Sequence, residues 1–382
     1  MDYSREKLEV RPEKPVQELQ RLLKQLAGEA DWNTNISIKN RERQKKAFKN
    51  ARKKGEAWEP DFRFKDPGKD LSTLKYNIEK CIEASKKIGV EDVRDAGFKV
   101  LEPEDLQEFF RESFKELKLY VELADRVEKR KAWKSISKEI WPMVPKKEFR
   151  KSVKKVEGLQ PGEPEKVLDA EDLKKMFEDE ISRLGFDYGV EIRDVSGCFN
   201  RPSEEKLVVA NGEKGERRFS REEAEMLTKH EIFHVVRGVN GRGLSEKFDV
   251  LGVHSPLYDK TEEGGAVYRE RKTGANYESK DFDYHLRLIA AYKMSRGEAF
   301  HNVVEELMEL GGSLDRSFYL VARNREALRH HIYFSGIKAW EENSTEKLLM
   351  GKVSPEWAEK FWKEVEDGGF KRPEISGEAV FK

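Results

Sequence analysis

Cysteine is nearly absent from this chain of 382 residues, which contains only Cys81 and Cys198. Two cysteines this far apart exclude both a disulfide-rich scaffold and a zinc site made of cysteine pairs, and they fit the cytoplasmic location that we expect. Long apolar runs are absent too. The segment MDYSREKLEV lacks the apolar stretch of a secretory signal, and no run approaches 18 apolar residues, so we expect neither a cleaved signal nor a membrane span.

Net charge is also absent, because 74 Lys and Arg residues balance 74 Asp and Glu residues. The overall charge therefore favours no partner of either sign. Charged residues of both signs are nevertheless abundant, at 39% of the chain. This composition is typical of proteins in which surface ion-pair networks support the fold at high temperature.

One local excess of positive charge occurs in residues 39–54, where nine basic residues outnumber one acid and give a charge of +8. Phe48 is the only aromatic residue there, so the segment lacks the interleaved aromatics that stack on bases, and nucleic-acid binding is disfavoured. We interpret the segment as a solvated helix face balanced by acidic neighbours. The functional alternative is that it steers an acidic protein tail toward the molecule.

Helical periodicity dominates residues 1–141. Apolar residues recur at helical spacing in VQELQRLLKQLA, in LSTLKYNIEKCIEASKKI and in DLQEFFRESFKELKLYVELADRV, which predicts an N-terminal helical region. Four prolines then interrupt a polar stretch, so we expect a Pro-rich linker over residues 142–168. The region after it, residues 169–382, is expected to form a catalytic domain.

Extended structure is confined to a short part of that second region. VEIRDV and KLVVAN have the composition of strands, and the turn NGEKG separates KLVVAN from ERRFS. From Ser220 to the end the pattern is helical again, and Ser354 and Pro355 start the last long helix. The chain is therefore predicted to be a helix-dominated α+β protein with one small sheet.

The segment KHEIFHVVR contains the strongest chemical pattern. Ser220 and Glu223 have the spacing of a capping box, which predicts that a helix starts there. His230 and His234 are four residues apart on that helix, so both imidazoles can reach one zinc ion. Glu231 is offset by about 100°, where it can accept a proton from a zinc-bound water with a pKa near 7. Random placement predicts only about 0.02 such patterns in a chain of this composition.

A peptidase site of this kind needs a third protein ligand. The metzincin pattern requires Gly and His where this chain has Arg237 and Asn240, so that class is excluded. The alternative is a carboxylate from TEEGGAVYRE, which offers Glu262 and Glu263. His254, in LGVHSP, competes with them, and spacing alone does not choose among the three.

Six segments follow one another along most of the chain: EPDFRF, HEIFHVVRGVNG, EEGGA, GEAFHNVVEEL, the GG and YL pairs within residues 311–320, and LLMGKVSPE. In this order they resemble the QEGLA-motif family (flavohaemoglobin expression-modulating QEGLA-motif proteins), which includes the microtubule-associated tyrosine carboxypeptidases. The resemblance implies a gluzincin-like zincin fold, one Zn²⁺ ion and carboxypeptidase activity. It also implies His230 and His234 as ligands, Glu231 as the catalytic base and Glu263 as the third ligand.

The chain departs from the family pattern at several positions. Two residues rather than three separate the histidines, which is the usual spacing of zinc ligands on a helix. Glu262 stands where the family has Gln, and Gly265 where it has Leu; a helical glycine costs about 1 kcal/mol relative to Ala. NGRGLS and SLDR replace the family's NGxxQP and FTKD near the expected substrate cleft. The resemblance therefore supports the metal site more strongly than it supports specificity for tyrosine.

A carboxypeptidase also needs a hydrogen-bond donor for the oxyanion and a cation for the C-terminal carboxylate of the substrate. Tyr319, which matches the family's YL pair, is the leading candidate for the oxyanion donor, with His330 and His331 as the other candidates. The alternative interpretation of Tyr319 is a core residue of a long helix. A substrate carboxylate needs a cation, and Arg suits bidentate pairing with it. The candidates for that role are Arg237, Arg242 and Arg316, and for each of them the alternative is a solvated or structural ion pair.

The sequence thus predicts a zinc-dependent, carboxypeptidase-like enzyme that acts on the C-terminal tail of a peptide or protein. The alternative is a non-catalytic regulatory or binding protein that retains a zinc peptidase fold. Glu231 argues against this alternative, because a purely structural zinc site does not need that carboxylate.

Overall fold

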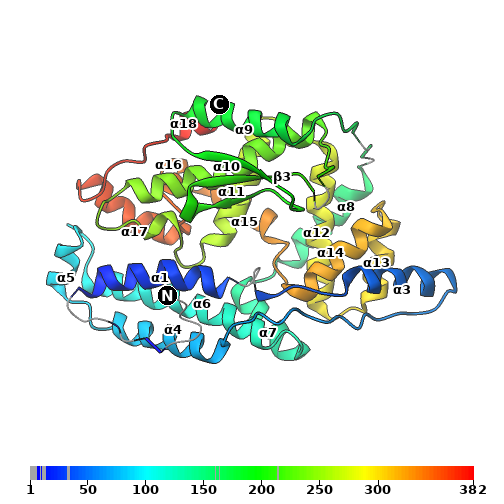
Figure 1. Ribbon diagram of the computed structural model, residues 1–382, viewed down its shortest axis with the longest axis horizontal. Coiled ribbons are helices and arrows are strands. Elements are labelled where there is room, and N and C mark those ends of the chain that lie inside the picture. Colours follow the sequence, from blue (N-terminus) through cyan, green and yellow to red (C-terminus); the bar gives the residue numbers. More distant parts are fainter. Residues whose placement is uncertain are drawn as a thin grey trace. The chain divides into compact units, whose positions relative to one another are not determined.

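The computed structural model describes residues 7, 8, 10, 14–31, 35–159, 161, 162, 164–212 and 215–382. These residues form many helices and one three-stranded sheet, which confirms the predicted helix-dominated α+β class (Figure 1). Among them, no helix combines the length and the apolar character needed to cross a bilayer.

The chain forms two compact units, each assembled from three stretches of sequence. Unit 1 comprises Met1–Lys87, Gln107–Gln160 and Phe282–Phe334, and unit 2 comprises Ile88–Leu106, Pro161–Asp281 and Ser335–Lys382. The change of unit after residue 160 falls inside the predicted linker. Much of that segment is helical, however, because α8 (Lys146–Glu157) begins directly after Pro145, whose fixed φ suits the start of a helix.

Unit 1 is built of helices. They are α1 (Pro15–Ala30), α3 (Arg41–Lys53), α4 (Leu71–Ser85), α6 (Pro103–Asp125), α7 (Arg130–Ile140), α8, α12 (Glu278–Arg296), α13 (Phe300–Glu309) and α14 (Leu314–Glu326), of which α6 and α12 begin in unit 2. The periodicity seen in the sequence explains their packing. Leu19, Leu22, Leu23 and Leu26 form one fully buried face of α1, which packs against α4.

The basic segment of residues 39–54 lies largely on α3. Lys45 and Lys49 pair with Asp315 of α14 at 3.3 and 3.1 Å. Arg52 pairs with Glu305 of α13 at 2.8 Å. One side of α3 is therefore balanced by acidic neighbours within unit 1.

Unit 2 contains the sheet. Its strands are β1 (Gly189–Arg193), β2 (Phe199–Arg201) and β3 (Lys206–Ala210), in the order β1-β3-β2, with β1 parallel and β2 antiparallel to β3. β1 and β3 correspond to the predicted segments VEIRDV and KLVVAN. The segment ERRFS forms only an isolated bridge between Phe219 and Leu168, and the turn predicted before it includes residues 213 and 214, which lie outside the described residues.

The helices of unit 2 are α5 (Val90–Asp95), α9 (Ala170–Leu184), α10 (Arg221–Gly243), α11 (Tyr258–Lys272), α15 (Ile332–Glu342, beginning in unit 1), α16 (Thr345–Leu349), α17 (Pro355–Glu366) and α18 (Gly377–Val380). α9 packs on β1 and β3, while α10 contacts α9, α11 and β2 (Figure 1). α10 therefore contacts both the sheet and α11, and most of its second half is buried.

Candidate metal centre

The helix that contains HEIFH begins where the sequence predicts. The hydroxyl oxygen of Ser220 accepts a hydrogen bond from the backbone N–H of Glu223 at 3.0 Å and so caps α10. The carboxylate of Glu223 pairs with Arg217 at 3.1 Å. The helix then continues without a break through His230 and His234, which places both imidazoles on the same face.

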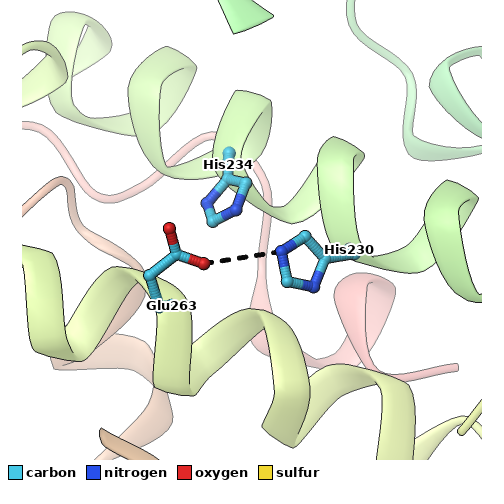
Figure 2. A group of neighbouring side chains, drawn as sticks. All are labelled: His230, His234 and Glu263. Carbon is cyan, nitrogen blue, oxygen red and sulfur yellow. Dashed lines mark ion pairs between the residues drawn. The ribbon is translucent and has the colours of Figure 1, made fainter. Parts of the chain in front are cut away.

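His230 and His234 of α10 and Glu263 of α11 form one compact group. A ligand atom from each lies within 4.8 Å of the others, and His230 Nε2 is 3.6 Å from Glu263 Oε2. Figure 2 shows the carboxylate directed toward the two rings from the neighbouring helix. Imidazole nitrogens and a carboxylate oxygen at such separations can bind one divalent ion.

A second pair of carboxylates holds the far side of the two rings. His230 Nδ1 lies 2.6 Å from Glu270 Oε1, and His234 Nδ1 lies 3.0 Å from Glu262 Oε1. An ionised carboxylate can only accept a hydrogen bond, so each Nδ1 is the donor in these two contacts. This is the arrangement that fixes the tautomer and the ring orientation of metal-binding histidines.

The electrostatics of the group follow from its burial and its charges. Burial lowers the pKa of His230, but hydrogen bonds with Glu263 and Glu270 outweigh it and raise the pKa to about 10. Glu231, next along the helix, is half-buried. Its burial raises its pKa, although the neighbouring His230 and His234 oppose the shift. Glu231 is therefore an acid beside the group whose surroundings favour acceptance of a proton.

The three candidates for the third ligand have different surroundings in the structure. Glu263 belongs to the group, whereas Glu262 points to the Nδ1 side of His234. His254 is 2% exposed and lies edge-on to Tyr258, with ring centroids 5.2 Å apart. Burial and the charge of Lys352 lower the pKa of His254 to about 3.

Two of the arginines considered for a substrate carboxylate lie in unit 2. Arg237 is fully buried, and its guanidinium donates to Glu262 Oε2 at 2.6 Å and to the carbonyl oxygens of Leu348 and Val353 at 3.2 and 2.8 Å. Arg237 therefore forms a structural ion pair, as its alternative interpretation predicts. Arg242 is 3.7 Å from Glu205 and partly exposed.

The remaining candidates belong to unit 1. Tyr319 is 36% exposed on α14, which contradicts its interpretation as a core residue, and its ring stacks with the guanidinium of Arg316 at 5.3 Å. Arg316 also pairs with Asp283. His330 is buried, and His331 Nε2 lies 3.0 Å from the carbonyl oxygen of Pro142. The oxyanion and carboxylate roles of Tyr319 and Arg316 stay predictions from the sequence.

Sequence reasoning missed two residues of the centre. Glu270 follows Glu262 by about two helical turns, a spacing that indicates a shared helix face but does not reveal which partner it meets. Lys352 Nζ lies 3.2 Å from Glu262 Oε1 and comes from a segment about 90 residues further on. No local pattern of the sequence connects Lys352 with α11.

Comparison with known proteins identifies a family. A family model described as "Microtubule-associated tyrosine carboxypeptidase" matches residues 49–324, which is more than half of the chain and includes α10 and α11. No curated protein and no solved structure matches the chain.

Proposed function

Because the chain belongs to the microtubule-associated tyrosine carboxypeptidase family, we propose that it is a zinc-dependent, carboxypeptidase-like enzyme with a zincin fold. The observation that supports this most directly is the group of His230, His234 and Glu263 on two adjacent helices. Two imidazole nitrogens and one carboxylate oxygen are the ligand set of many catalytic zinc sites. These donors suit Zn²⁺ better than Mg²⁺ or Ca²⁺, which prefer oxygen ligands alone.

Zinc in this position supplies a Lewis acid that polarises a carbonyl group and lowers the pKa of a water molecule. Glu231 is the base that we propose: its carboxylate accepts a proton from the attacking water and returns it to the leaving amine. The raised pKa of Glu231 supports this role. Glu262 and Glu270 keep both Nε2 atoms directed toward the ligand position.

The substrate that we propose is the C-terminal tail of a peptide or protein, with a terminal tyrosine as the first residue to examine. The experiment first measures the zinc content of the full chain. The protein is then incubated with peptides that end in Tyr, Phe, Glu or Lys, and mass spectrometry follows the mass of each peptide. We expect one zinc ion per chain and loss of the last residue only, fastest for Tyr. If the zinc-loaded protein hydrolyses none of these peptides, the enzyme proposal is wrong and a binding function is favoured.

A further inference from the structure

We propose that Arg237 and Lys352 hold Glu262 in a buried clamp that positions the ring of His234, so that both act as positioning residues of the metal centre. This inference rests on the proposed zinc site. It assigns a role to two cations that do not touch the ligand group themselves, and it connects that group with the segment of residues 348–353.

The clamp has three donors on one carboxylate. Glu262 Oε1 accepts from His234 Nδ1 at 3.0 Å and lies 3.2 Å from Lys352 Nζ. Glu262 Oε2 accepts from Arg237 Nη1 at 2.6 Å. These four residues belong to unit 2 and are at most 9% exposed. Because both oxygens of Glu262 are bound in this way, turning the carboxylate away from His234 would break its contacts with Arg237 and Lys352.

The two cations are themselves fixed by the backbone. Arg237 donates to the carbonyl oxygens of Leu348 and Val353, at the two ends of a short segment. The backbone N–H of Lys352 donates to the carbonyl oxygen of Leu251 at 2.7 Å. The clamp is therefore anchored at both ends of residues 348–353, and a shift of this segment would move Glu262 and with it the ring of His234.

The charge at position 262 explains why two cations are needed. A buried carboxylate without compensation is strongly unfavourable. Lys352 at 3.2 Å and Arg237 at 2.6 Å place two positive charges beside this buried carboxylate, which compensates its charge and leaves it able to accept the hydrogen bond from His234 Nδ1. A glutamine here would present an amide N–H₂ group either to Arg237 or to His234, and neither of these donors can accept it. Glu262, Arg237 and Lys352 are therefore mutually dependent.

The test compares Glu262→Gln, Arg237→Lys and Lys352→Met with the matched control Glu180→Gln. Glu180 is 7% exposed in the same unit, and its carboxylate is likewise held by basic side chains, namely Arg183, Lys229 and Arg269. The zinc dissociation constant of each folded protein is measured by competition with a chelating dye. Long-range ¹H–¹⁵N NMR of the imidazole rings reports which nitrogen of His234 bears the proton.

We expect zinc binding to weaken about tenfold or more in Glu262→Gln, in the range seen for direct partners of metal ligands. In Arg237→Lys and Lys352→Met, which act through Glu262, we expect it to weaken several-fold. The ring signals of His234 should change, while Glu180→Gln should bind zinc within about twofold of wild type. Unchanged zinc binding and ring signals in Lys352→Met and Arg237→Lys would overturn the clamp, as would an equal loss in Glu180→Gln. If the wild-type protein binds no zinc, the proposed function is wrong. The ring signals of His234 in the metal-free variants then show by themselves whether the clamp positions this ring.

Discussion

At the scale of single residues, the carboxylates of the candidate centre have two different positions, one on the ligand side of the histidine rings and one behind them. Glu263 faces Nε2 of His230, whereas Glu270 and Glu262 accept hydrogen bonds from the Nδ1 atoms of His230 and His234. Glu262 and Glu263 are adjacent in sequence, and the turn of about 100° between them directs one to the ligand side and the other to the rear. Exchanging their roles is therefore impossible without rotating α11.

Glu231 offers the clearest single-residue prediction. Glu231→Gln keeps the size of the side chain but cannot accept the proton of water, so we expect kcat to fall by at least about a hundredfold. Zinc content should stay at the wild-type level, because this residue is not in the proposed ligand set. His234→Ala, in contrast, should lose the metal. Peptide hydrolysis and elemental analysis of the same samples give the answer, and full activity of Glu231→Gln would rule out the proposed base.

The residues of the site differ in how far the sequence can predict them. His230, Glu231 and His234 follow from local helical spacing and from the cap at Ser220. Glu263 needed the family pattern, since spacing alone leaves its neighbour equally eligible. Glu270 and the cations of the clamp depend on how distant segments pack, and periodicity within one helix contains no information about that.

At the scale of elements, glycines bring α11 close to α15. A Cβ atom on Gly264 would lie 2.1 Å from the backbone of Gly336, and one on Gly265 would lie 2.5 Å from Trp340 and 2.6 Å from Phe233. The indole N–H of Trp340 donates to the carbonyl oxygen of Thr261 at 2.8 Å. The helical glycine at 265, which replaces a family leucine, is therefore required by the packing of Trp340 in this chain.

Restoring that leucine should be harmful. Gly265→Leu forces Trp340 out of its place, and we expect a loss of stability of about 2 kcal/mol, within the range for overpacked cores. Denaturant unfolding measures the loss. Combining the change with Trp340→Ala should recover part of it, which a double-mutant cycle would record as a coupling energy. Equal losses with and without Trp340→Ala would show that the two side chains do not compete for this space.

Glu180 links three elements of unit 2. It lies on α9 and pairs with Lys229 of α10 at 2.9 Å and with Arg269 of α11. Burial raises its pKa, but Arg183, Lys229 and Arg269 outweigh burial and lower the pKa from 4.5 to about 2. Because the folded-state pKa is depressed, the stabilisation is fully present above pH 4.5 and is lost as the pH falls toward 2.

Glu180→Gln should therefore remove a pH-dependent part of the stability. We expect a loss of about 3 kcal/mol near pH 7, typical of a broken buried pair, and a much smaller loss near pH 2. Unfolding by urea at a series of pH values measures the difference. A loss that is independent of pH would contradict an ionised Glu180 in the folded protein.

The elements were predictable where their pattern is long and local. The apolar stripe of α1 and the Ser220 cap of α10 each depend on residues that are close together in the sequence. β2 has only three residues, too few for an alternating pattern, and it forms because β3 offers an edge. α8 was not predicted because it lies in a stretch with several prolines. Pro145 directly precedes the helix and does not interrupt it.

At the scale of the whole molecule, the zero net charge conceals an uneven distribution. Unit 1 contains 44 Lys and Arg residues against 31 Asp and Glu residues, a charge of +13, and unit 2 contains 30 against 43, a charge of −13. On α3, acidic neighbours balance only part of the basic face. Arg43, Lys46 and Lys53 are exposed and form no ion pair within the described part of the chain.

These three side chains allow a test of whether α3 steers an acidic substrate. We expect Arg43→Glu, Lys46→Glu and Lys53→Glu, combined in one protein, to raise KM for an acidic C-terminal peptide about tenfold at low salt, because electrostatic attraction raises the encounter rate by at least about that factor. The difference should shrink toward zero near 1 M salt, where the Debye length is about 3 Å. Steady-state kinetics over a salt series measures both effects.

The matched control reverses the charge of three exposed lysines of unit 2, namely Lys166, Lys175 and Lys363. It changes the net charge by the same amount, so an effect of net charge alone would raise KM equally in both triple variants. Steering by α3 requires a larger rise in the α3 variant and a steeper dependence on salt. Identical KM values in the α3 variant and in the wild-type protein would show that this basic face is merely solvated, because a charge that attracts substrate cannot be reversed without cost to the encounter.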